Sequence, residues 1–243
     1  MTKLPSPAEA KRRGEEKERM IVDFLSEEVY SDLVTLMRLV NVTDERNMRK
    51  FLKRLESKCL IKKETLVMPT GKISLWGITD TGLMNSETLP HSPQRVFEPY
   101  LVKFATLNHT LMRQRVQIDL TNKGWTGWRN GDRQSFKNDF KVDHRPDAIV
   151  TTPDGTQVAI EVELSLKTPH RYRSILKSHI TAREKGYWKF ALYIVANEKA
   201  KLALNRAFER VEYIQFGESR YSVDSYRKEL VRIFKIEDVQ HIK

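Results

Sequence analysis

A polar stretch that carries three prolines, residues 86–99, divides the sequence into two parts. Proline lacks a backbone N–H and its ring clashes with the preceding helical turn, so this stretch cannot continue a regular helix. Its composition is that of a linker. Apolar residues before it recur at helical spacing, whereas those after it also form short strand-like runs. The sequence therefore predicts two domains, residues 1–91 and residues 92–243.

The composition is that of a folded protein with a polyanionic partner. The chain has 243 residues, of which 40% are hydrophobic and 31% are charged. Its 43 Lys and Arg residues against 32 Asp and Glu residues give a formal net charge of +11. Such an excess favours nucleic acid as the partner, ahead of an anionic membrane surface.

Two absences argue against an exported or membrane-spanning protein. The sequence has no run of about 18 apolar residues and no apolar block near its start, which a spanning helix or a secretory signal would need. Its single cysteine, Cys59, can form neither an internal disulfide nor a Cys-based zinc site. We therefore expect a cytoplasmic protein without membrane insertion.

The first domain has the pattern of a winged helix. Three segments between residues 16 and 58 have helical periodicity. Two segments rich in β-branched residues, 60–68 and 73–78, follow and are joined by a turn around Gly71. Three helices followed by a hairpin predict a winged-helix DNA-binding domain in residues 1–91.

The third of these helices separates charge from apolar surface. At 100° per residue its apolar side chains cluster on one side and its cations on the other. A cationic face can contact phosphates and enter a major groove, and a charged solvent face on a helical bundle is the alternative. The predicted DNA-binding residues are Arg46, Arg49, Lys50 and Lys53.

The second domain alternates helices and strands. A long helix over residues 100–122 precedes strands at 125–128, 147–152 and 157–164. A helix from about residue 169, a buried strand at 190–195 and a further helix complete the order. This order predicts an α/β domain built on a sheet.

Three acids interrupt two of these apolar strands. Alternate residues of a strand share a face, so Glu161 and Glu163 point to the same side. Asp147 begins the preceding strand, and a tight turn would bring it beside Glu161. Carboxylates that cluster in this way are ligands for Mg²⁺ or Mn²⁺. The alternative is that Asp147 caps a turn and both glutamates face solvent.

These acids resemble the motif of the PD-(D/E)xK restriction-endonuclease-like nucleases. The match is Pro146-Asp147 on one strand and Glu161-x-Glu163 on the next. The motif has a lysine where this chain has Glu163, and the resemblance makes Lys167 its nearest substitute. We therefore expect Asp147 and Glu161 to hold the metal, with Glu163 as a further ligand or a base, and Lys167 to stabilise the charge of the transition state.

The chain also resembles the replication-relaxation family over most of its length. The residues that carry this likeness are Asn108-His109, Arg145-Pro146-Asp147 and the stretch from Glu161 to Tyr172. Within the family, the layout is most similar to the MOBC class of plasmid mobilisation relaxases. The resemblance implies a restriction-endonuclease-like domain with a central mixed sheet in residues 92–243. It also implies a metal-dependent endonuclease that nicks one strand at a plasmid transfer origin to initiate conjugative mobilisation. Its partners would be plasmid DNA and an accessory mobilisation protein of a relaxosome.

Further residues near these motifs have two interpretations each. His109 points into the site or is a structural histidine. His144 orients Asp147 or contacts phosphate, or it is simply exposed, as its place in a loop favours. Tyr172 is a nucleophile or a packing residue, with attack by water preferred. The helix from residue 169 contacts a DNA backbone or is a solvated face, and its predicted DNA-binding residues are Arg171, Arg173 and Lys177.

A different class of function stays open. The chain could be a non-catalytic DNA-binding replication or transcription factor whose nuclease-like domain has lost its lysine.

Overall fold

The computed structural model describes residues 6–69, 71–87 and 95–242. The chain divides into two compact units, residues 1–115 and 116–243. The predicted boundary near residue 92 lies outside the described residues. No helix in the described ranges is both long enough and apolar enough to cross a membrane.

Unit 1 begins with three helices whose starts are fixed by side-chain caps. They are α1 (Pro7–Glu28), α2 (Leu33–Leu39) and α3 (Glu45–Ser57). The carboxylates of Asp32 and Asp44 accept backbone N–H groups in the first turns of α2 and α3, at 2.9 and 2.8 Å. An aspartate at this position satisfies a donor that the helix leaves unpaired. The three helices expected from periodicity are therefore present.

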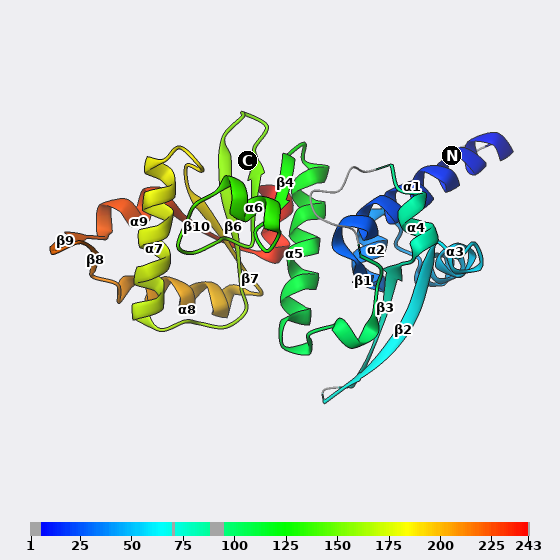
Figure 1. Ribbon diagram of the computed structural model, residues 1–243, viewed down its shortest axis with the longest axis horizontal. Coiled ribbons are helices and arrows are strands. Elements are labelled where there is room, and N and C mark those ends of the chain that lie inside the picture. Colours follow the sequence, from blue (N-terminus) through cyan, green and yellow to red (C-terminus); the bar gives the residue numbers. More distant parts are fainter. Residues whose placement is uncertain (1–5, 70, 88–94, 243) are drawn as a thin grey trace. The chain divides into compact units, whose positions relative to one another are not determined.

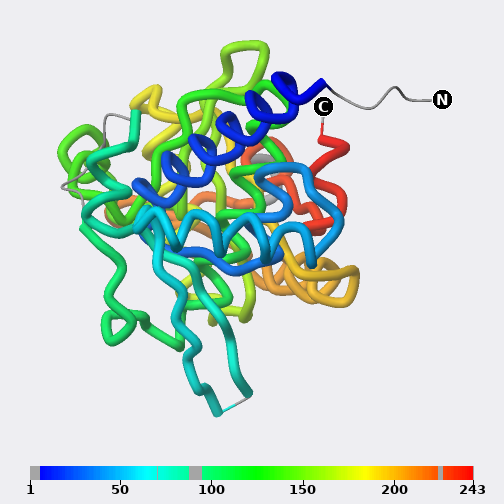
Figure 2. Tube along the Cα trace, turned by 90° about the vertical axis from the view of Figure 1, so that its right-hand side faces the viewer, coloured from blue at the N-terminus to red at the C-terminus, as the bar shows by residue number. Residues whose placement is uncertain are grey.

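A three-stranded antiparallel sheet follows. Its strands are β1 (Tyr30–Asp32), β2 (Ile61–Met68) and β3 (Gly71–Ile78), in the order β1-β3-β2. Strands β2 and β3 match the expected hairpin, which extends away from the helices of this unit (Figure 2). The three-residue strand β1 was not predicted, because it is too short to show alternation. Buried side chains that form the core of this unit include Ile21, Leu25, Leu36, Met48, Leu52, Leu55, Leu75 and Ile78.

Helix α5 (Phe104–Asn122) starts later than the expected helix over 100–122. The short helices α4 (Asp80–Met84) and η1 (Pro99–Leu101) precede it. Leu107, Leu111 and Ile118 of its predicted apolar stripe are buried, but Leu101 and Phe104 are exposed.

A buried ion pair ties the first part of α5 to α1. The Arg113 guanidinium lies 2.7 Å from the Glu28 carboxylate, and both side chains are buried. Beside them, the Ser31 hydroxyl donates to the Gln114 side chain at 2.7 Å. A buried charge needs such a partner, so these contacts join the start of α5 to the core of unit 1.

Unit 2 contains a five-stranded mixed sheet in the order β10-β7-β6-β5-β4 (Figure 1). Strands β6, β7 and β10 are parallel, whereas β5 and β4 are antiparallel to their neighbours. The strands are β4 (Thr126–Asn130), β5 (Ala148–Thr151), β6 (Gln157–Glu163), β7 (Ala191–Val195) and β10 (Val231–Lys235). The first four confirm the expected strands, and β10 was not predicted.

Helices connect the parallel strands, as parallel pairing requires. Helix α7 (Pro169–Glu184) lies between β6 and β7, and α8 (Glu198–Glu209) follows β7. Both were expected. Smaller elements that the sequence did not reveal are α6 (Gln134–Asp139), the hairpin β8 (Tyr213–Phe216) and β9 (Ser219–Ser222), α9 (Asp224–Leu230) and η2 (Ile236–His241).

Strand β6 presents different side chains to its two faces. Val158, Ile160 and Val162 alternate with Ala159, Glu161 and Glu163, and all six are buried. Ala159 packs in the hydrophobic core with residues of α7. Both glutamates therefore lie on the α7 face of the sheet, not on a solvent-facing strand.

Candidate functional site

The start of β5 is fixed by a close approach of two backbones. The Gly131 N–H donates to the Asp147 carbonyl at 2.9 Å, and the Arg145 guanidinium donates to the Gly131 carbonyl at 3.0 Å. A Cβ atom at residue 131 would lie 1.8 Å from the Pro146 carbonyl oxygen. Only glycine fits there, so this contact sets the position of Asp147.

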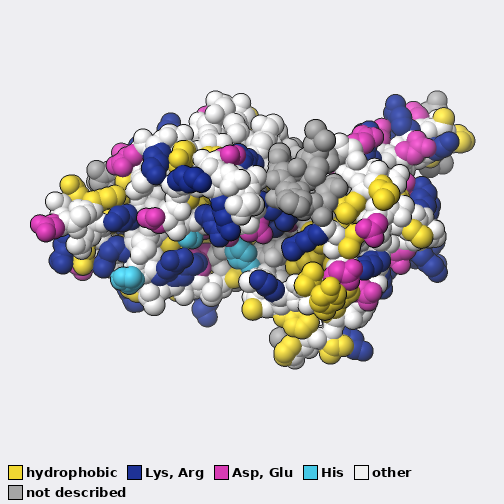
Figure 3. Space-filling view, viewed as in Figure 1, with side chains coloured by type: hydrophobic (Ala, Val, Ile, Leu, Met, Phe, Trp, Pro, Cys, Tyr) yellow, Lys and Arg dark blue, Asp and Glu magenta, His cyan; other side chains and the backbone are white. Residues whose placement is uncertain are grey.

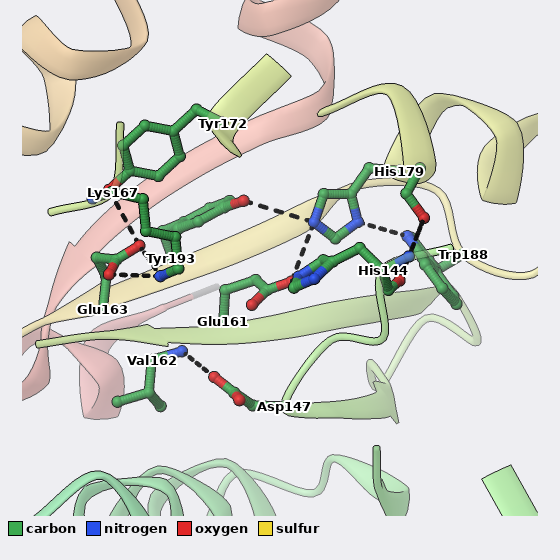
Figure 4. Close-up of polar contacts among 11 residues, drawn as sticks. His144, Asp147, Glu161, Val162, Glu163, Lys167, Tyr172, His179, Trp188 and Tyr193 are labelled. Atoms are coloured by element: carbon green, nitrogen blue, oxygen red, sulfur yellow. Dashed lines mark hydrogen bonds and ion pairs between the residues drawn. The ribbon is translucent and has the colours of Figure 1, made fainter. Parts of the chain in front are cut away.

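Asp147 is bonded to the backbone of β6 on both sides of Glu161. Its N–H donates to the Ile160 carbonyl at 3.0 Å, and its carboxylate accepts the Val162 N–H at 2.7 Å. Ile160 is the last residue of β6 that pairs with β5, so the carboxylate extends the ladder by one bond. Figure 4 shows Asp147 beside the β6 backbone, with the Glu161 and Glu163 side chains directed away from it.

Glu161 is a buried carboxylate between two imidazoles. One of its oxygens, Oε1, lies 2.8 Å from His144 Nε2 and 3.1 Å from His179 Nε2. The residue is only 7% exposed. Burial raises the pKa of Glu161, but the hydrogen bonds from His144 and His179 outweigh it and lower the pKa to about 2. Glu161 is therefore ionised at neutral pH.

His144 reaches Glu161 because its loop is anchored to α7. The His144 N–H donates to the Ser178 hydroxyl at 3.0 Å, and that hydroxyl donates to the His144 carbonyl at 3.2 Å. The imidazole is partly buried and in contact with Glu161. The expectation of simple exposure was therefore wrong, because Ser178 holds the loop against the helix.

His179 is fully buried, and its tautomer follows from its neighbours. The Trp188 indole N–H donates to His179 Nδ1 at 3.1 Å. An indole nitrogen only donates, so Nδ1 is an acceptor and neutral His179 carries its proton on Nε2. Nε2 then donates to Glu161, and the Tyr193 hydroxyl lies 3.5 Å away (Figure 4). His179 was not among the residues predicted from the sequence.

His144, Glu161 and His179 form the one group of three potential metal ligands with closely spaced donor atoms among the described residues. A metal on Nε2 of His179 would force the proton onto Nδ1, where it would face the N–H of Trp188. Histidines that bind metals normally donate their second N–H to an acceptor. His179 therefore fits a hydrogen-bond donor that orients Glu161 and does not fit a metal ligand.

Glu163 is held by an ammonium group and a phenol. Both of its carboxylate oxygens lie 2.6 Å from Lys167 Nζ, and the Tyr172 hydroxyl donates to it at 3.1 Å. Tyr172 is fully buried. Burial, together with the charge of Glu163, raises the pKa of the Tyr172 phenol well above its ordinary value. A protonated phenol bound in this way is a poor nucleophile.

The structure does not bring the three predicted acids around one point. Each carboxylate has partners of its own: a backbone N–H for Asp147, two imidazoles for Glu161 and Lys167 for Glu163. Asp147 and Glu161 are nevertheless neighbours across β5 and β6. Their carboxylates are the hard oxygen donors that Mg²⁺ and Mn²⁺ prefer, whereas Glu163 is engaged in its ion pair.

The cations of α3 lie on an exposed face. Met48, Leu52 and Leu55 of the same helix are buried, so the expected separation of faces is present. Arg49 forms an ion pair with Glu45 at 2.6 Å. Arg46, Arg49, Lys50 and Lys53 line a shallow hollow of about 480 Å³ with Glu45.

The predicted cations of α7 are arranged differently. Arg171 is exposed, but the Arg173 guanidinium stacks 4.1 Å from the centre of the Tyr213 ring and donates to the Tyr213 carbonyl. Lys177 Nζ lies 5.1 Å from the centre of the Phe216 ring. Two of these three cations therefore contact the β8–β9 hairpin. His109, the remaining candidate, lies in α5 within unit 1 and is partly buried.

Comparison with known proteins adds a family match. A sequence model of the Replication-relaxation family matches residues 31–190. The matched range begins in β1 and ends just before β7. It includes Asp147, Glu161 and Glu163 with their side-chain partners His144, Lys167, Tyr172 and His179. No curated protein matches the chain.

Proposed function

Because the chain belongs to the Replication-relaxation family, which suggests a role in plasmid replication or mobilisation, we propose that it is a plasmid mobilisation relaxase that nicks one DNA strand at a transfer origin. The observation that carries this proposal is Glu161, a buried carboxylate kept ionised beside Asp147. Burial of an ionised carboxylate is costly. Its presence where two strands meet supports a catalytic site at the Asp147 and Glu161 positions of the nuclease motif.

Unit 1 would position the enzyme on duplex DNA. Its order of helices and antiparallel strands is compatible with a winged helix, in which α3 enters the major groove and the β2–β3 hairpin contacts the flanking backbone. The exposed Arg46, Lys50 and Lys53 would contact phosphates. Accessory mobilisation proteins of a relaxosome would be its protein partners.

To hold Mg²⁺ or Mn²⁺ together, Asp147 and Glu161 would have to turn toward one ion from the separate hydrogen bonds that they make in this structure. The ion would supply an activated water and neutralise charge that develops on the phosphate. His144 and His179 orient the Glu161 carboxylate through its Oε1 atom. Trp188 fixes the tautomer of His179 and with it the direction of that hydrogen bond. Lys167 is partly exposed beside Glu163. Its ammonium group would take the role of the motif lysine and stabilise charge on a phosphate oxygen.

Nicking of supercoiled plasmid DNA that carries the cognate origin tests this proposal. With Mg²⁺ or Mn²⁺ the wild-type chain should produce open circles. Asp147→Asn and Glu161→Gln should each lower the rate by about 100-fold or more, because each removes a charged metal ligand.

Asp154→Asn is the matched control. Asp154 is exposed in the turn between β5 and β6, and asparagine is well tolerated in such turns, so this variant should nick like the wild type. Nicking that persists in both Asp147→Asn and Glu161→Gln would contradict the proposed site.

A non-catalytic DNA-binding factor is the second candidate. It is favoured by Glu163, which replaces the lysine of the motif and pairs with Lys167 at 2.6 Å. A protein of this kind would bind origin DNA through unit 1 but leave it supercoiled with every divalent metal. Binding without nicking would therefore favour this second function.

A further inference from the structure

One arginine on the exposed face of α3 is paired with an acid of the same helix. The Glu45 Oε1 atom lies 2.7 Å from Nε and 2.6 Å from Nη2 of Arg49. Glu45 is in the first turn of α3, and Arg49 follows four residues later, so the two side chains lie one above the other. The pair therefore orients the Arg49 guanidinium on the surface of the helix.

The other three cations of this face are neighbours of like charge. Arg46 and Lys50 are four residues apart, Lys50 and Lys53 are three apart, and all three side chains are exposed. Like charges at these spacings repel one another and destabilise a helix. A DNA phosphate would relieve that repulsion. Figure 3 shows Lys and Arg side chains at the edge of unit 1 where α3 lies.

The carboxylate of Glu45 makes Arg49 poorly suited to a phosphate. A phosphate on the Arg49 guanidinium would stand close to the Glu45 carboxylate, and the two negative charges would repel each other. The edge of a guanine is different, because it is neutral and offers the acceptors N7 and O6 to the fork of an arginine. Glu45 engages the Nε and Nη2 side of that fork, and its Nη1 and Nη2 end also presents a pair of donors.

Both kinds of side chain face the same hollow. The hollow on α3 measures about 480 Å³, and its lining consists of Glu45, Arg46, Arg49, Lys50 and Lys53. A base edge bound by the paired arginine and phosphates bound by the other cations would therefore belong to one DNA site.

We propose that Arg49 reads a guanine in the major groove and that Glu45 is its positioning residue. The remaining cations of the hollow bind phosphates without regard to sequence. This inference rests on the proposed function, in which α3 docks on duplex DNA, and it assigns sequence recognition to one side chain. An ion pair that only supports the helix is the alternative.

Selection from a library of duplexes tests the proposal. The library has a randomised core of about 12 base pairs, a little over one turn of the double helix, and selection takes place in EDTA with the full chain. The wild type should enrich a motif that contains a guanine. Arg49→Gln should replace guanine by adenine at one position, because a glutamine amide pairs with N6 and N7 of adenine. An unchanged motif in Arg49→Gln would overturn the proposal, and so would a wild-type motif without guanine.

Lys53→Gln is the matched control, because it introduces the same side chain on the same face. It removes a phosphate contact, so affinity should fall about 3-fold for every sequence. The slope of log affinity against log salt concentration should fall by about 1. The selected motif should stay that of the wild type, and a changed base in this variant would overturn the assignment of recognition to Arg49.

Glu45→Gln separates positioning of Arg49 from support of the helix. Without the carboxylate, Arg49 can bind a phosphate, so duplexes that lack the motif should bind about 3-fold more tightly. Discrimination between the motif and its guanine-to-adenine variant should fall about 10-fold. If circular dichroism shows less helix in Glu45→Gln but discrimination is unchanged, the ion pair only supports the helix and the positioning role is overturned.

The two proposals can fail separately. If the wild type does not nick but Arg49→Gln changes the selected base, the relaxase proposal fails and the role of Arg49 stands. If the wild type nicks and Arg49→Gln selects the same motif, only the role of Arg49 fails.

Discussion

Two glutamates on one face of β6 are held in chemically different surroundings. Glu161 lies in a histidine pocket formed with His144, His179 and Trp188. Glu163, two residues further on, lies in a lysine pocket formed with Lys167 and Tyr172. The first carboxylate is held by imidazoles and the second is neutralised by an ammonium group. Equal spacing along a strand therefore does not imply equal chemistry.

The two pockets also differ in how strongly they constrain their glutamate. His179 and Trp188 are fully buried, so the histidine pocket is rigid and its hydrogen bonds have defined donors. Lys167 is 34% exposed, which lets solvent screen its pair with Glu163. The histidine pocket is thus built to orient a carboxylate, and the lysine pocket to neutralise one.

The largest expected difference between the two pockets is in how acid changes the free energy of unfolding. The folded-state pKa of Glu161, about 2, lies below its ordinary value of 4.5. Its contribution to stability is therefore complete above pH 4.5 and is lost as pH falls toward 2. The difference corresponds to about 3 kcal/mol in the free energy of unfolding. Urea unfolding in EDTA between pH 6 and pH 2 should show this loss in the wild type and in Glu163→Gln, but not in Glu161→Gln.

If Glu161→Gln loses as much unfolding free energy in acid as the wild type does, the loss comes from other acids. The two pockets would then not differ in the way described.

Removal of Lys167 should destabilise the protein, because the buried Glu163 carboxylate loses its ion pair. In Lys167→Met the buried Glu163 carboxylate keeps its hydrogen bond from the Tyr172 hydroxyl but loses the ammonium group. We expect a loss of about 2 kcal/mol, less than for a fully buried pair because Lys167 is partly exposed. The double variant Glu163→Gln with Lys167→Met should recover most of it. Purely additive unfolding free energies in this double-mutant cycle would contradict the pairing.

The indole of Trp188 should control the tautomer of His179. Nitrogen-15 NMR at neutral pH should find the proton on Nε2 and none on Nδ1. Trp188→Phe removes the donor to Nδ1 and should cost about 1 kcal/mol of stability. It should also lower nicking about 10-fold by loosening the orientation of Glu161. A proton on Nδ1 in the wild type would instead reopen His179 as a metal ligand.

Loss of the Tyr172 hydroxyl should have the smallest effect. Tyr172→Phe keeps the buried ring and removes one hydrogen bond to Glu163, which should cost less than about 1 kcal/mol. Nicking should stay within about twofold of the wild-type rate, since the proposed attack uses water. Abolished nicking, together with a protein-linked DNA end in the wild type, would instead make Tyr172 the nucleophile.

Most of the large elements of the fold could be predicted from periodicity. Helices α3 and α7 and strands β6 and β7 carry the longer apolar patterns, and each appears within a few residues of the expected range. Strand β1 and the β8–β9 hairpin have three or four residues per strand. Patterns of that length cannot be told from chance, because partners distant in sequence decide whether such strands form.

The site could be predicted only in part. Alternation along β6 correctly gave the shared face of Glu161 and Glu163, but their partners come from distant segments. A signal for His179 was nevertheless present. Tyr172, Leu176 and His179 share the buried face of α7 at helical spacing, and a histidine on such a face needs a polar partner.

The pattern of cations along a helix predicts which of them are exposed only where the other face of that helix is clearly apolar. Helix α3 has sharply separated faces, and its predicted cations are exposed. Helix α7 contacts core residues and the β8–β9 hairpin, so Arg173 and Lys177 stack on aromatic rings. The sequence could not show this, because the hairpin that receives them follows about 40 residues later.

The buried pair between Glu28 and Arg113 decides where the chain can be truncated. A piece that ends at residue 91 would keep Glu28 in the core but lose the guanidinium opposite it. Loss of one member of such a pair costs about 3–5 kcal/mol. A piece that ends after Arg115 retains both. Any attempt to isolate unit 1 by truncation, to test the proposed DNA docking, should therefore use the longer piece.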